Sequence, residues 1–364
     1  MDYLVKKNII KKNKVIIDVG SKYIKLLGVH YANKKITITN AQKIDSSLFF
    51  NDNELVNVGE LVRNIDRIMS KNKNVEISLS IPTSIVNSKI VSVKNKKVAE
   101  LAKYIEREHT TFSKVSPLTH IIDYAYLGSR EENGDSIHYC LVAAVSKNSV
   151  NLILDEFNKR KLKISTISYP IYDLVNLSEL YHGDFENMNR LMIDFGVSGT
   201  RVVAFYEGVA VYVRDINIGV NTYLEKLFEC QESLGKPEIF KLISAVGEMK
   251  ILTMESLKKL FSSMNKEAYF NIVNEVSSQL AKDIFRIAEM CENNNAAITK
   301  IICGGFMIKG FDERLKQNGD MEVESFDLNL LENVSGRDFI VQLGNAHVDS
   351  TFNNAIGLAI NTFM

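Results

Sequence analysis

Two stretches of this chain place an aspartate at the end of an apolar, strand-like run and directly before a glycine-containing turn. In residues 191–208, LMIDFGVSGTRVVAFYEG, Asp194 precedes Gly196, Ser198 and Gly199, and a β-branched and aromatic run follows. Glycine lets the backbone N–H groups of such a turn approach an anion closely. The neighbouring carboxylate can hold a cation through water. This arrangement is typical of a site for a metal-bound phosphate.

The other stretch, residues 15–30, has the same order of residue types. Its sequence, VIIDVGSKYIKLLGVH, contains Asp18, then Gly20 and Ser21, then a second apolar run. Each stretch predicts a β-hairpin, and the two lie about half the chain length apart. We therefore expect a duplicated architecture in which one hairpin begins each half and the two face each other across a cleft. The alternative is two ordinary sheet hairpins, because Asp and Gly are common turn residues.

A third glycine-containing segment follows a buried strand late in the sequence. In KIICGGFMIKGF, Gly304 and Gly305 come after the apolar run 300–303. Paired glycines at this position let a flat ring or a ribose lie against the backbone. The alternative is a tight turn between a strand and a helix. The segment gains weight from its order, since it is third after the two Asp-Gly hairpins.

Composition limits the classes of protein to which the chain can belong. Its 364 residues suit two domains or several subdomains, and 46% hydrophobic with 24% charged residues is typical of a soluble globular protein. Lys+Arg and Asp+Glu both number 44, so no overall basic surface indicates nucleic acid. No run of about 18 apolar residues predicts a membrane span. The first fourteen residues are basic and lack the features of a signal peptide.

The cysteines and histidines give no indication of zinc. The four cysteines are scattered in apolar surroundings, without paired motifs, and are expected to be reduced core residues: Cys140, Cys230, Cys291 and Cys303. The six histidines show no spacing that suits a metal site.

Hydrophobic periodicity predicts the elements that position these segments. Strands are expected over 33–40, 74–81, 86–93, 119–127, 137–145, 163–168, 209–216 and 300–303. Helices are expected over 60–69, 98–105, 150–157, 219–228, 272–290 and 353–360, with one more beginning at Pro170. Asn221 and Thr222 are candidate N-caps for the helix over 219–228. Residues 86–161 form a self-contained strand-helix-strand-strand-helix block inside the first half.

The full order of these segments resembles the actin-like ATPase superfamily and, within it, the PilM family of type IV pilus assembly proteins. The resemblance covers nearly the whole chain. IIDVGSKYIKLLGV is similar to the first phosphate motif, and ISLSIPTSIVNSKIVSV with AELAKYIEREHTTFSKVSPLTHIIDYAYLG is similar to the opening of the inserted subdomain. LVAAVSKNSVNLILDEFNKRKLKISTIS resembles the end of that subdomain, YVRDINIGVN the segment after the second phosphate hairpin, and LAKDIFRIAEM the adenosine-side helix.

This resemblance implies an α/β fold, a duplicated actin-like (ribonuclease H-like) fold with two halves around a nucleotide cleft and an inserted α+β subdomain in the first half. The implied divisions are 1–85 and 162–190 for domain I, 86–161 for the insert, 191–345 for domain II with a helical lobe at about 229–270 and an adenosine motif at 300–311, and 346–364 for a C-terminal helix returning to domain I.

The resemblance also implies roles for individual residues. Asp18 and Asp194 would hold Mg²⁺, and Lys25 would act as a point charge on the phosphates of ATP. The implied phosphate-binding set is Gly20, Ser21, Lys22, Lys25, Gly196, Ser198, Gly199, Thr200 and Asn221. Gly304, Gly305 and Phe306, with Lys282 and Arg286 on the preceding helix, would border the adenosine. For Lys282 and Arg286 the alternative is that they simply face water.

Two departures from the family pattern bear on catalysis. Phe306 stands where the family more often has a third glycine, and Tyr169 precedes Pro170 where relatives commonly carry an acid. An acid near that position could orient the attacking water, whereas a tyrosine phenol is a poor base at neutral pH. We therefore expect ATP binding with at most slow hydrolysis, and assign no catalytic residue.

The family resemblance implies a partner and a place in the cell. The partner is the cytoplasmic N-terminal segment of PilN, an inner-membrane pilus protein, bound in a groove between the main sheet and the insert; the alternative is a closed seam. The protein would be cytoplasmic, held at the membrane through PilN, with motor ATPases as further partners and a homo-oligomer as an option.

Two other functions remain open at this point. The first is an FtsA-like cell-division ATPase, which ends in a membrane-binding amphipathic helix, whereas this sequence ends at AIGLAINTFM. The second is a small-substrate kinase of the sugar-kinase branch. Such a kinase needs a catalytic base and a substrate pocket in the cleft, and the sequence offers no candidate for either.

Overall fold

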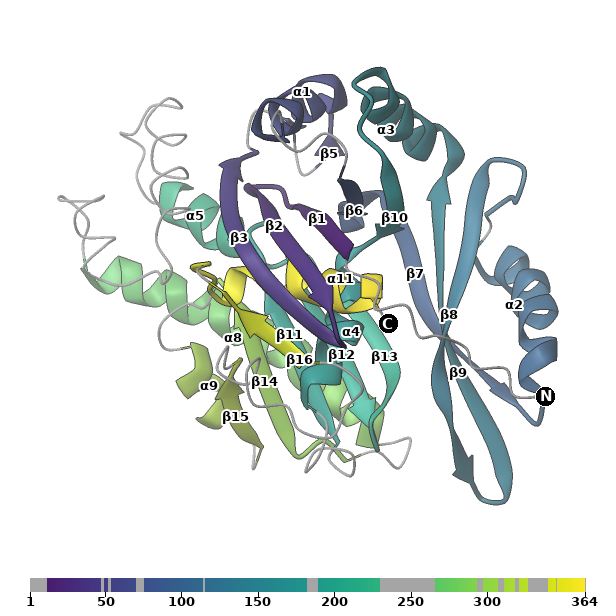
Figure 1. Ribbon diagram of the computed structural model, residues 1–364. Helices are drawn as coiled ribbons and strands as arrows, with labels where there is room; N and C mark the ends of the chain where they lie inside the picture. Colours follow the sequence, from purple (N-terminus) through teal and green to yellow (C-terminus); the bar gives the residue numbers. More distant parts are fainter. Residues whose placement is uncertain are drawn as a thin grey trace.

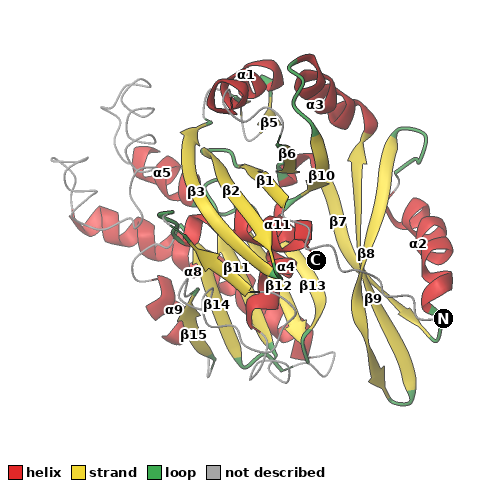
Figure 2. Ribbon diagram, in the orientation of Figure 1, coloured by secondary structure: helices red, strands yellow, loops and turns green. Residues whose placement is uncertain are grey.

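The computed structural model describes residues 12–46, 49–51, 54–69, 75–113, 115–181, 189–229, 266–292, 297–306, 311–317, 321–326, 340–344 and 346–363. Most of the helical lobe expected at 229–270 lies outside these residues. The described chain forms two large sheets with helices around them, and a smaller sheet stands beside them (Figures 1 and 2). None of the helices in the described ranges is long and apolar enough to cross a membrane.

The first large sheet has the strand order β10-β6-β1-β2-β3-β16. Its strands are β1 (Lys12–Val19), β2 (Tyr23–Ala32), β3 (Lys35–Asp45), β6 (Glu76–Ser80), β10 (Ile164–Ser168) and β16 (Ile340–Leu343). β1 pairs with β2 in antiparallel fashion and with β6 in parallel, and β6 is parallel to β10. The carboxyl ends of β1, β6 and β10 therefore lie together at one edge of the sheet.

The second large sheet repeats this arrangement. Its order is β13-β12-β11-β14-β15, formed by β11 (Arg190–Phe195), β12 (Thr200–Tyr206), β13 (Val209–Ile216), β14 (Lys300–Gly305) and β15 (Glu322–Ser325). β11 is antiparallel to β12 and parallel to β14, as β1 is to β2 and β6. The order and direction of β3-β2-β1-β6-β10 and β13-β12-β11-β14-β15 match. The expected duplication is confirmed.

The insert is a separate α+β unit, seen to the right in Figure 1. Its elements are β7 (Val86–Lys94), α2 (Val98–Ser113), β8 (His120–Glu132), β9 (Asp135–Ser146) and α3 (Lys147–Lys159), with strand order β7-β9-β8. Asn133 and Gly134 both have positive φ, the conformation of a two-residue hairpin turn whose twist matches the flanking strands. A small core of its own, around Leu101 and Val142, holds α2 on the sheet.

The remaining elements are α1 (Val58–Ile68), α4 (Pro170–Leu177), α5 (Val220–Glu229), α8 (Lys266–Glu292), α9 (Phe311–Gln317) and α11 (Asn353–Phe363), with the 3₁₀ turns η2 (Thr83–Ile85), η3 (Ser178–Tyr181) and η4 (Ser350–Phe352) and the short strands β4 (Phe50–Asn51) and β5 (Glu54–Leu55).

Two element bounds differ from the sequence prediction. α5 begins at Val220, so Asn221 and Thr222 lie in its first turn rather than capping it. β14 continues through Gly304 and Gly305 instead of ending before them.

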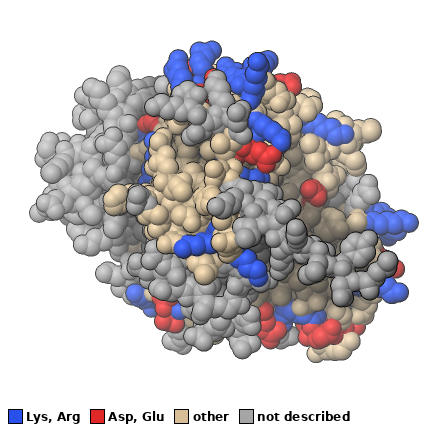
Figure 3. All heavy atoms as spheres, in the orientation of Figure 1, with Lys and Arg blue, Asp and Glu red and all other residues tan. Residues whose placement is uncertain are grey.

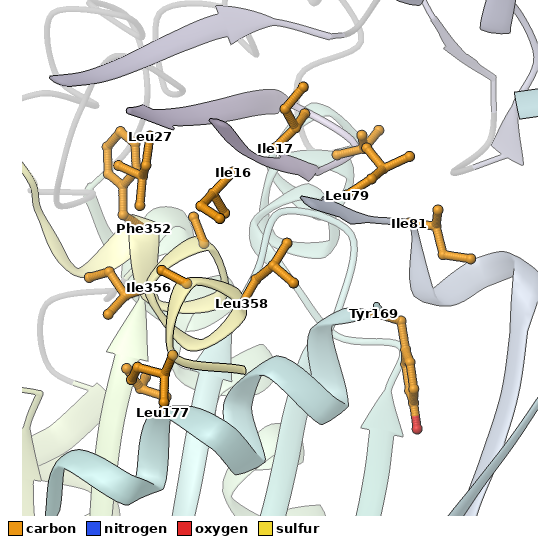
Figure 4. Close-up of a cluster of buried hydrophobic side chains, with 14 of the residues drawn as sticks. Ile16, Ile17, Leu27, Leu79, Ile81, Tyr169, Leu177, Phe352, Ile356 and Leu358 are labelled. Carbon is orange, nitrogen blue, oxygen red and sulfur yellow. The ribbon is translucent and has the colours of Figure 1, made fainter. Parts of the chain in front are cut away.

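The main core lies between the first sheet and the pair α4 and α11. Ile16 and Leu27 face Phe352, Ile356 and Leu358 of the C-terminal segment, as Figure 4 shows. Burying such a side chain contributes about 1.5–3 kcal/mol relative to leaving it exposed. The C-terminal helix, far away in sequence, is thereby fixed under the strand that carries Asp18.

The crossing of α11 and α4 depends on a glycine. A Cβ atom on Gly357 would overlap the carbonyl oxygen of Asp173 in α4, so only glycine allows the two backbones to approach this closely. The second sheet has a separate core against α5 and α8, built from residues such as Ile193 and Ile284. Charged side chains of both signs are distributed over the face drawn in Figure 3, in agreement with the balanced composition.

Candidate functional site

The first hairpin places Asp18 opposite Lys25 on the neighbouring strand. The Lys25 Nζ donates to Asp18 Oδ2 at 2.7 Å, and both side chains are buried. Asp18 is in register with Ser80, the last residue of β6, so the carboxylate stands at the edge where parallel strands end. The turn between the strands is closed by the Gly20 N–H, which donates to the carbonyl of Tyr23.

The second hairpin repeats this pair with a different cation. Asp194 is in register with Arg201, and Arg201 Nη1 donates to Asp194 Oδ2 at 2.9 Å. The same oxygen accepts from Asn354 Nδ2 at 3.0 Å, from the first turn of α11. Sequence reasoning missed both Arg201 and Asn354. The signal for Arg201 was present, since it follows Asp194 by the spacing that separates Lys25 from Asp18.

Acidic and basic groups are equal in number around the two cavities where the hairpins meet. Burial opposes the charge on Arg201, but the carboxylates of Asp194, Asp215 and Asp18 outweigh it and raise the pKa of the guanidinium. The pKa of Asp215 is raised, because burial outweighs the attraction of Arg201. The charged residues that line the two polar cavities are three acids and three bases, so their formal charges balance when all are ionised: Asp18, Asp194 and Asp215 against Lys22, Lys25 and Arg201.

Two polar cavities adjoin the hairpins. The smaller, of about 30 Å³, lies between them and is lined by Gly20, Ser21, Lys22, Tyr23, Lys25, Asp194, Phe195, Gly196, Val197, Ser198, Arg201, Gly305, Phe306, Thr351 and Asn354. The rings of Tyr23 and Phe306 stack across it with centroids 6.3 Å apart. Sites for drug-sized ligands are typically about 300–1,000 Å³, so the rings must separate before a nucleotide can enter here.

The larger polar cavity, of about 320 Å³, lies beside the smaller one. Its lining includes Asp18, Gly20, Ser21, Lys25, Thr83, Ser84, Pro170, Ser198, Gly199, Arg201, Asp215, Asn217 and Asn354. Both cavities are lined by turn residues of each hairpin, together with two cations and an amide from α11: Gly20, Ser21, Ser198, Lys25, Arg201 and Asn354. The structure therefore gathers the predicted acids, glycines and serines of both hairpins around connected polar space.

Gly304 and Gly305 have a packing role that is independent of any ligand. Gly305 has φ +86°, and a Cβ there would overlap the Phe195 carbonyl oxygen and crowd Asp194. A Cβ on Gly304 would overlap the side-chain amide of Asn353. Glycine is thus needed at both positions to bring β14 against the second hairpin and α11. Of this pair, only Gly305 lines a polar cavity, with Phe306 beside it.

The other residues predicted for cofactor binding lie in varied places. Lys22 lines the smaller cavity but also donates to Asp45 at 3.0 Å, and the Thr200 hydroxyl donates to the Ile218 carbonyl at 2.6 Å. Asn221 lies in α5, outside both linings, and its buried Oδ1 has no hydrogen-bond partner. Lys282 and Arg286 are exposed on α8 and line neither polar cavity.

The residues fit a hydrated Mg²⁺ better than a metal held by protein alone. Within the described ranges, no group of three or more His, Cys, Asp or Glu side chains could hold a metal ion. Asp18 and Asp194 supply two carboxylates, and Asn354 adds a buried Oδ1 without a partner close to Asp194. Mg²⁺ prefers oxygen ligands, keeps several waters and is usually shared with phosphate oxygens, and this donor set suits such binding.

The side chain of Tyr169 does not face the cleft in which an attacking water would lie. It lines an apolar cavity on the insert side and neither polar cavity, and in Figure 4 its hydroxyl points away from the core cluster. Burial raises the pKa of its phenol, so it cannot serve as a base at neutral pH.

A buried acid that the sequence analysis missed lies four residues beyond Tyr169. Asp173 accepts hydrogen bonds from Ser168 Oγ at 2.6 Å and Ser80 Oγ at 2.5 Å, and is fully buried behind Asp18. Burial raises its pKa well above the ordinary value. Asp173 lines neither polar cavity, so it does not border the space in which an attacking water would lie.

The apolar cavity, of about 390 Å³, lies between the insert and the first sheet. We call it the apolar groove; its lining is Ile81, Val86, Ile121, Asp123, Tyr124, Ala125, Leu141, Ala143, Val145, Val150, Ile167, Ser168, Tyr169 and Tyr172. Val86 lines both the apolar groove and the larger polar cavity. The seam between the insert and the main sheet is therefore open.

The strand order, the paired hairpins and the inserted subdomain define the class: the chain has the duplicated actin-like fold. Among solved structures, it is similar to the PilM–PilN type IV pilus biogenesis complex, with 14% identity over 96% of this chain and 98% of that chain and a TM-score of 0.72. This likeness establishes the fold.

Weaker likenesses extend to other proteins. They include the ethanolamine utilization protein EutJ from Carboxydothermus hydrogenoformans (12% identity, 98% of this chain and 93% of that chain, TM-score 0.44) and MreB 5 of Spiroplasma citri bound to AMPPNP (11%, 86% and 91%, TM-score 0.46). No protein-family profile matches the chain. No curated protein sequence matches it either.

Proposed function

We propose that this protein is an actin-like scaffold that binds Mg·ATP between its two hairpins and binds an extended peptide in its apolar groove. One observation carries the proposal. The two Asp-Gly hairpins lie beside an open apolar groove, and Val86 lines both this groove and the larger polar cavity. By similarity to the PilM–PilN complex, the peptide would be the cytoplasmic N-terminal segment of a PilN-like inner-membrane protein. The scaffold would link this membrane partner to cytoplasmic pilus motor ATPases.

The pairing of the buried acids supports Mg·ATP rather than free ATP as the ligand. Free ATP would draw Lys25 and Arg201 away from the two hairpin aspartates and leave buried carboxylates without their cations, whereas a divalent cation takes the place of those cations. Asp18 and Asp194 would hold the hydrated metal, and Lys25 would bind a phosphate as a point charge. The turn N–H groups of both hairpins would complete the phosphate cradle. Entry requires Tyr23 and Phe306 to separate.

Slow hydrolysis follows from the groups around the cleft. Tyr169 faces the apolar groove, and the buried acid Asp173 is hydrogen-bonded to two serines outside both polar cavities. Neither can orient a water in the cleft, and the acid that lines the larger cavity, Asp215, lies 3.9 Å from Arg201 and is engaged by it. We therefore infer that nucleotide serves mainly to hold or change the conformation. A steady-state rate on the order of 10 per second, typical of working enzymes, would contradict this.

The apolar groove suits an extended peptide. β8 ends the order of the insert sheet and β10 ends that of the first sheet, and residues of both strands line the groove. Ile121 on β8 is 41% exposed and Ile167 on β10 is 36% exposed. An edge strand offers unpaired backbone groups to an added strand, while the flanking pockets receive alternate side chains.

Calorimetry tests the nucleotide site. We expect wild-type protein to bind Mg·ATP, and Asp18→Asn and Asp194→Asn each to bind roughly tenfold or more weakly, since each loses a charged hold on the metal. Equal, measurable affinity in all three proteins would show that the nucleotide binds elsewhere. Absence of binding to the wild type would refute the nucleotide part of the proposal.

Peptide titration tests the groove separately. A synthetic peptide from the cytoplasmic end of a PilN-like partner is titrated against wild type, Ile121→Asp and Leu152→Asp. Leu152 is a matched control, because it is 53% exposed on α3 and lies outside the groove lining. We expect Ile121→Asp to weaken binding at least about tenfold, since a charge would be buried under the peptide, and Leu152→Asp to have little effect. Equal loss in both would place the peptide elsewhere.

The larger polar cavity supports a small-substrate kinase as a second candidate. The cavity supplies the space that such a kinase needs, and Asp215 places a carboxyl with a raised pKa in it. A carboxyl that can accept the proton of the attacking hydroxyl is what phosphoryl transfer by general-base catalysis requires. Phosphorylation of glycerol or a sugar with Mg·ATP, abolished in Asp215→Asn, would favour this candidate over the scaffold.

A further inference from the structure

Arg201 joins three parts of the molecule. Its guanidinium donates to Asp194 Oδ2 at 2.9 Å, donates to Thr83 Oγ1 at 3.3 Å from Nη2, and lies 3.9 Å from Asp215 Oδ1. Thr83 begins η2, which leads directly into the first strand of the insert. Arg201 also lines both polar cavities, so its charged end borders the space in which phosphates would lie.

The contact with Asp194 alone does not explain why a guanidinium is buried here. A buried ion pair adds little net stability over apolar side chains of similar volume, since desolvation offsets the attraction. Asp194 Oδ2 already receives the amide of Asn354, so the carboxylate has one partner without Arg201. By contrast, a planar fork of donors matches phosphate oxygens closely, and Lys25 presents the same kind of charge from the opposite hairpin.

We propose that Arg201 is a phosphate-binding residue of the cleft that exchanges Asp194 for the terminal phosphate of the nucleotide when a divalent cation takes over the carboxylate. This inference rests on the proposed binding of Mg·ATP. Metal alone must compete with the guanidinium for Asp194, and nucleotide alone must draw Arg201 away from Asp194 and leave a buried carboxylate without its cation. Only the two together satisfy Asp194 and Arg201 at once, so metal and triphosphate bind cooperatively.

The exchange predicts effects of opposite sign in one variant. In Arg201→Gln, Asp194 loses its competing cation, so Mn²⁺ alone, used as the probe metal, should bind several-fold more tightly than in wild type. Mg·ATP should bind roughly ten- to a hundredfold more weakly, the effect of losing a charge-assisted hydrogen bond to phosphate. Mg·ADP, which lacks the terminal phosphate, should lose less affinity than Mg·ATP.

The experiment measures Mn²⁺, Mg·ATP and Mg·ADP binding by calorimetry on wild type, Arg201→Gln, Arg201→Lys and Arg63→Gln, with circular dichroism to verify folding. Arg201→Lys keeps the charge and should recover part of the Mg·ATP affinity, and it remains informative if Arg201→Gln does not fold. Arg63 is an exposed residue on α1 paired with Glu60, and its variant should match wild type.

The outcomes distinguish failure of this inference from failure of the proposed Mg·ATP binding. If wild type binds no nucleotide, both are wrong. If wild type binds Mg·ATP and folded Arg201→Gln binds it equally well, only the role of Arg201 is wrong. If Arg201→Gln weakens Mg·ATP and Mg·ADP alike while leaving Mn²⁺ affinity unchanged, Arg201 acts through the fold and the exchange is refuted.

Discussion

The two hairpins are copies in topology but differ in what surrounds them. In both, an aspartate lies one residue before the end of the first strand and a cation lies opposite it on the second, at 2.7 Å for Asp18 and Lys25 and 2.9 Å for Asp194 and Arg201. Asp18 stands beside Ser80 of its own sheet. Asp194 instead receives Asn354 from α11, and its partner Arg201 reaches Thr83 before the insert.

This difference shows which parts of a duplicated site the duplication itself determines. The cross-strand pair depends only on hairpin register, so it is repeated in both halves. The third partner depends on elements that return from elsewhere in the chain, and there the halves diverge. The cations also differ in chemistry, because a lysine is a compact charge on a flexible stem whereas a guanidinium is a planar fork of donors.

The largest expected effect breaks the equivalence of the two pairs. Asp194→Asn should lower the free energy of unfolding by about 3 kcal/mol, because it leaves a buried guanidinium without its closest carboxylate. Asp18→Asn should cost about 1–2 kcal/mol less, since the lysine left behind has a flexible stem and can turn toward the adjoining polar cavities, whereas Arg201 is also held by Thr83. Urea denaturation of both variants without nucleotide measures the difference. Equal losses would mean that water in the adjoining cavities screens both cations alike.

The next effect concerns the joint beneath both hairpins. Gly357→Ala should lower the free energy of unfolding by about 2 kcal/mol, because the new methyl group meets the Asp173 carbonyl and forces α4 and α11 apart. Gly59→Ala in α1 is the matched control, since its methyl group meets only the flexible carboxylate of Glu156. The control should be neutral or slightly stabilising. A tolerated Gly357→Ala would show that the crossing can relax.

The sequence predicted the parts of this fold that depend on local pattern. Both hairpins, the order of strands and helices in the insert and the long helix α8 follow from hydrophobic periodicity and turn chemistry, and the structure has them. The bounds moved by a few residues where an element continued past a local signal. β14 runs through Gly304 and Gly305 because their close packing against Phe195 and Asn353 extends the strand.

The candidate site was only partly predictable. Asp18, Asp194 and the turn residues could be named because strand ends and glycines mark them. Asn354 and Asp173 could not be, since each reaches the site region through the packing of α11 or α4, which no local pattern encodes. The position of the Tyr169 side chain, which lines the apolar groove rather than the cleft, could not be predicted for the same reason.

A smaller, pH-dependent effect tests the acid behind the first hairpin. The pKa of Asp173 is raised by burial, so the folded state keeps its proton at pH values at which the unfolded state has lost it. Its contribution to stability is therefore complete below about pH 4 and is lost as pH rises through the folded pKa. Asp173→Asn mimics the protonated acid, so this variant should lose none of that stability as pH rises.

Urea denaturation of wild type and Asp173→Asn between pH 5 and pH 8 measures this contribution. The difference in unfolding free energy should widen in favour of the variant by about 1.4 kcal/mol per pH unit until the folded pKa is passed. Parallel curves over this range would mean that Asp173 is ionised in the folded protein and that its two serine donors outweigh burial.

The smallest expected effect tests one contact between the insert and the second half. Arg130 on β8 lies with its guanidinium carbon 3.4 Å from the ring centroid of Tyr206 and its Nε 3.3 Å from Glu207, both at the β12–β13 turn of the second half. Arg130→Gln should lower the free energy of unfolding by about 1 kcal/mol, mostly through the ring contact, because Glu207 is exposed to solvent.

Arg63→Gln, which breaks an exposed ion pair on α1, is the control and should change the free energy of unfolding by less than about 0.5 kcal/mol. A double-mutant cycle with Tyr206→Leu isolates the ring contact. No coupling in that cycle would show that this ring contact adds nothing to the attachment of the insert to the second half.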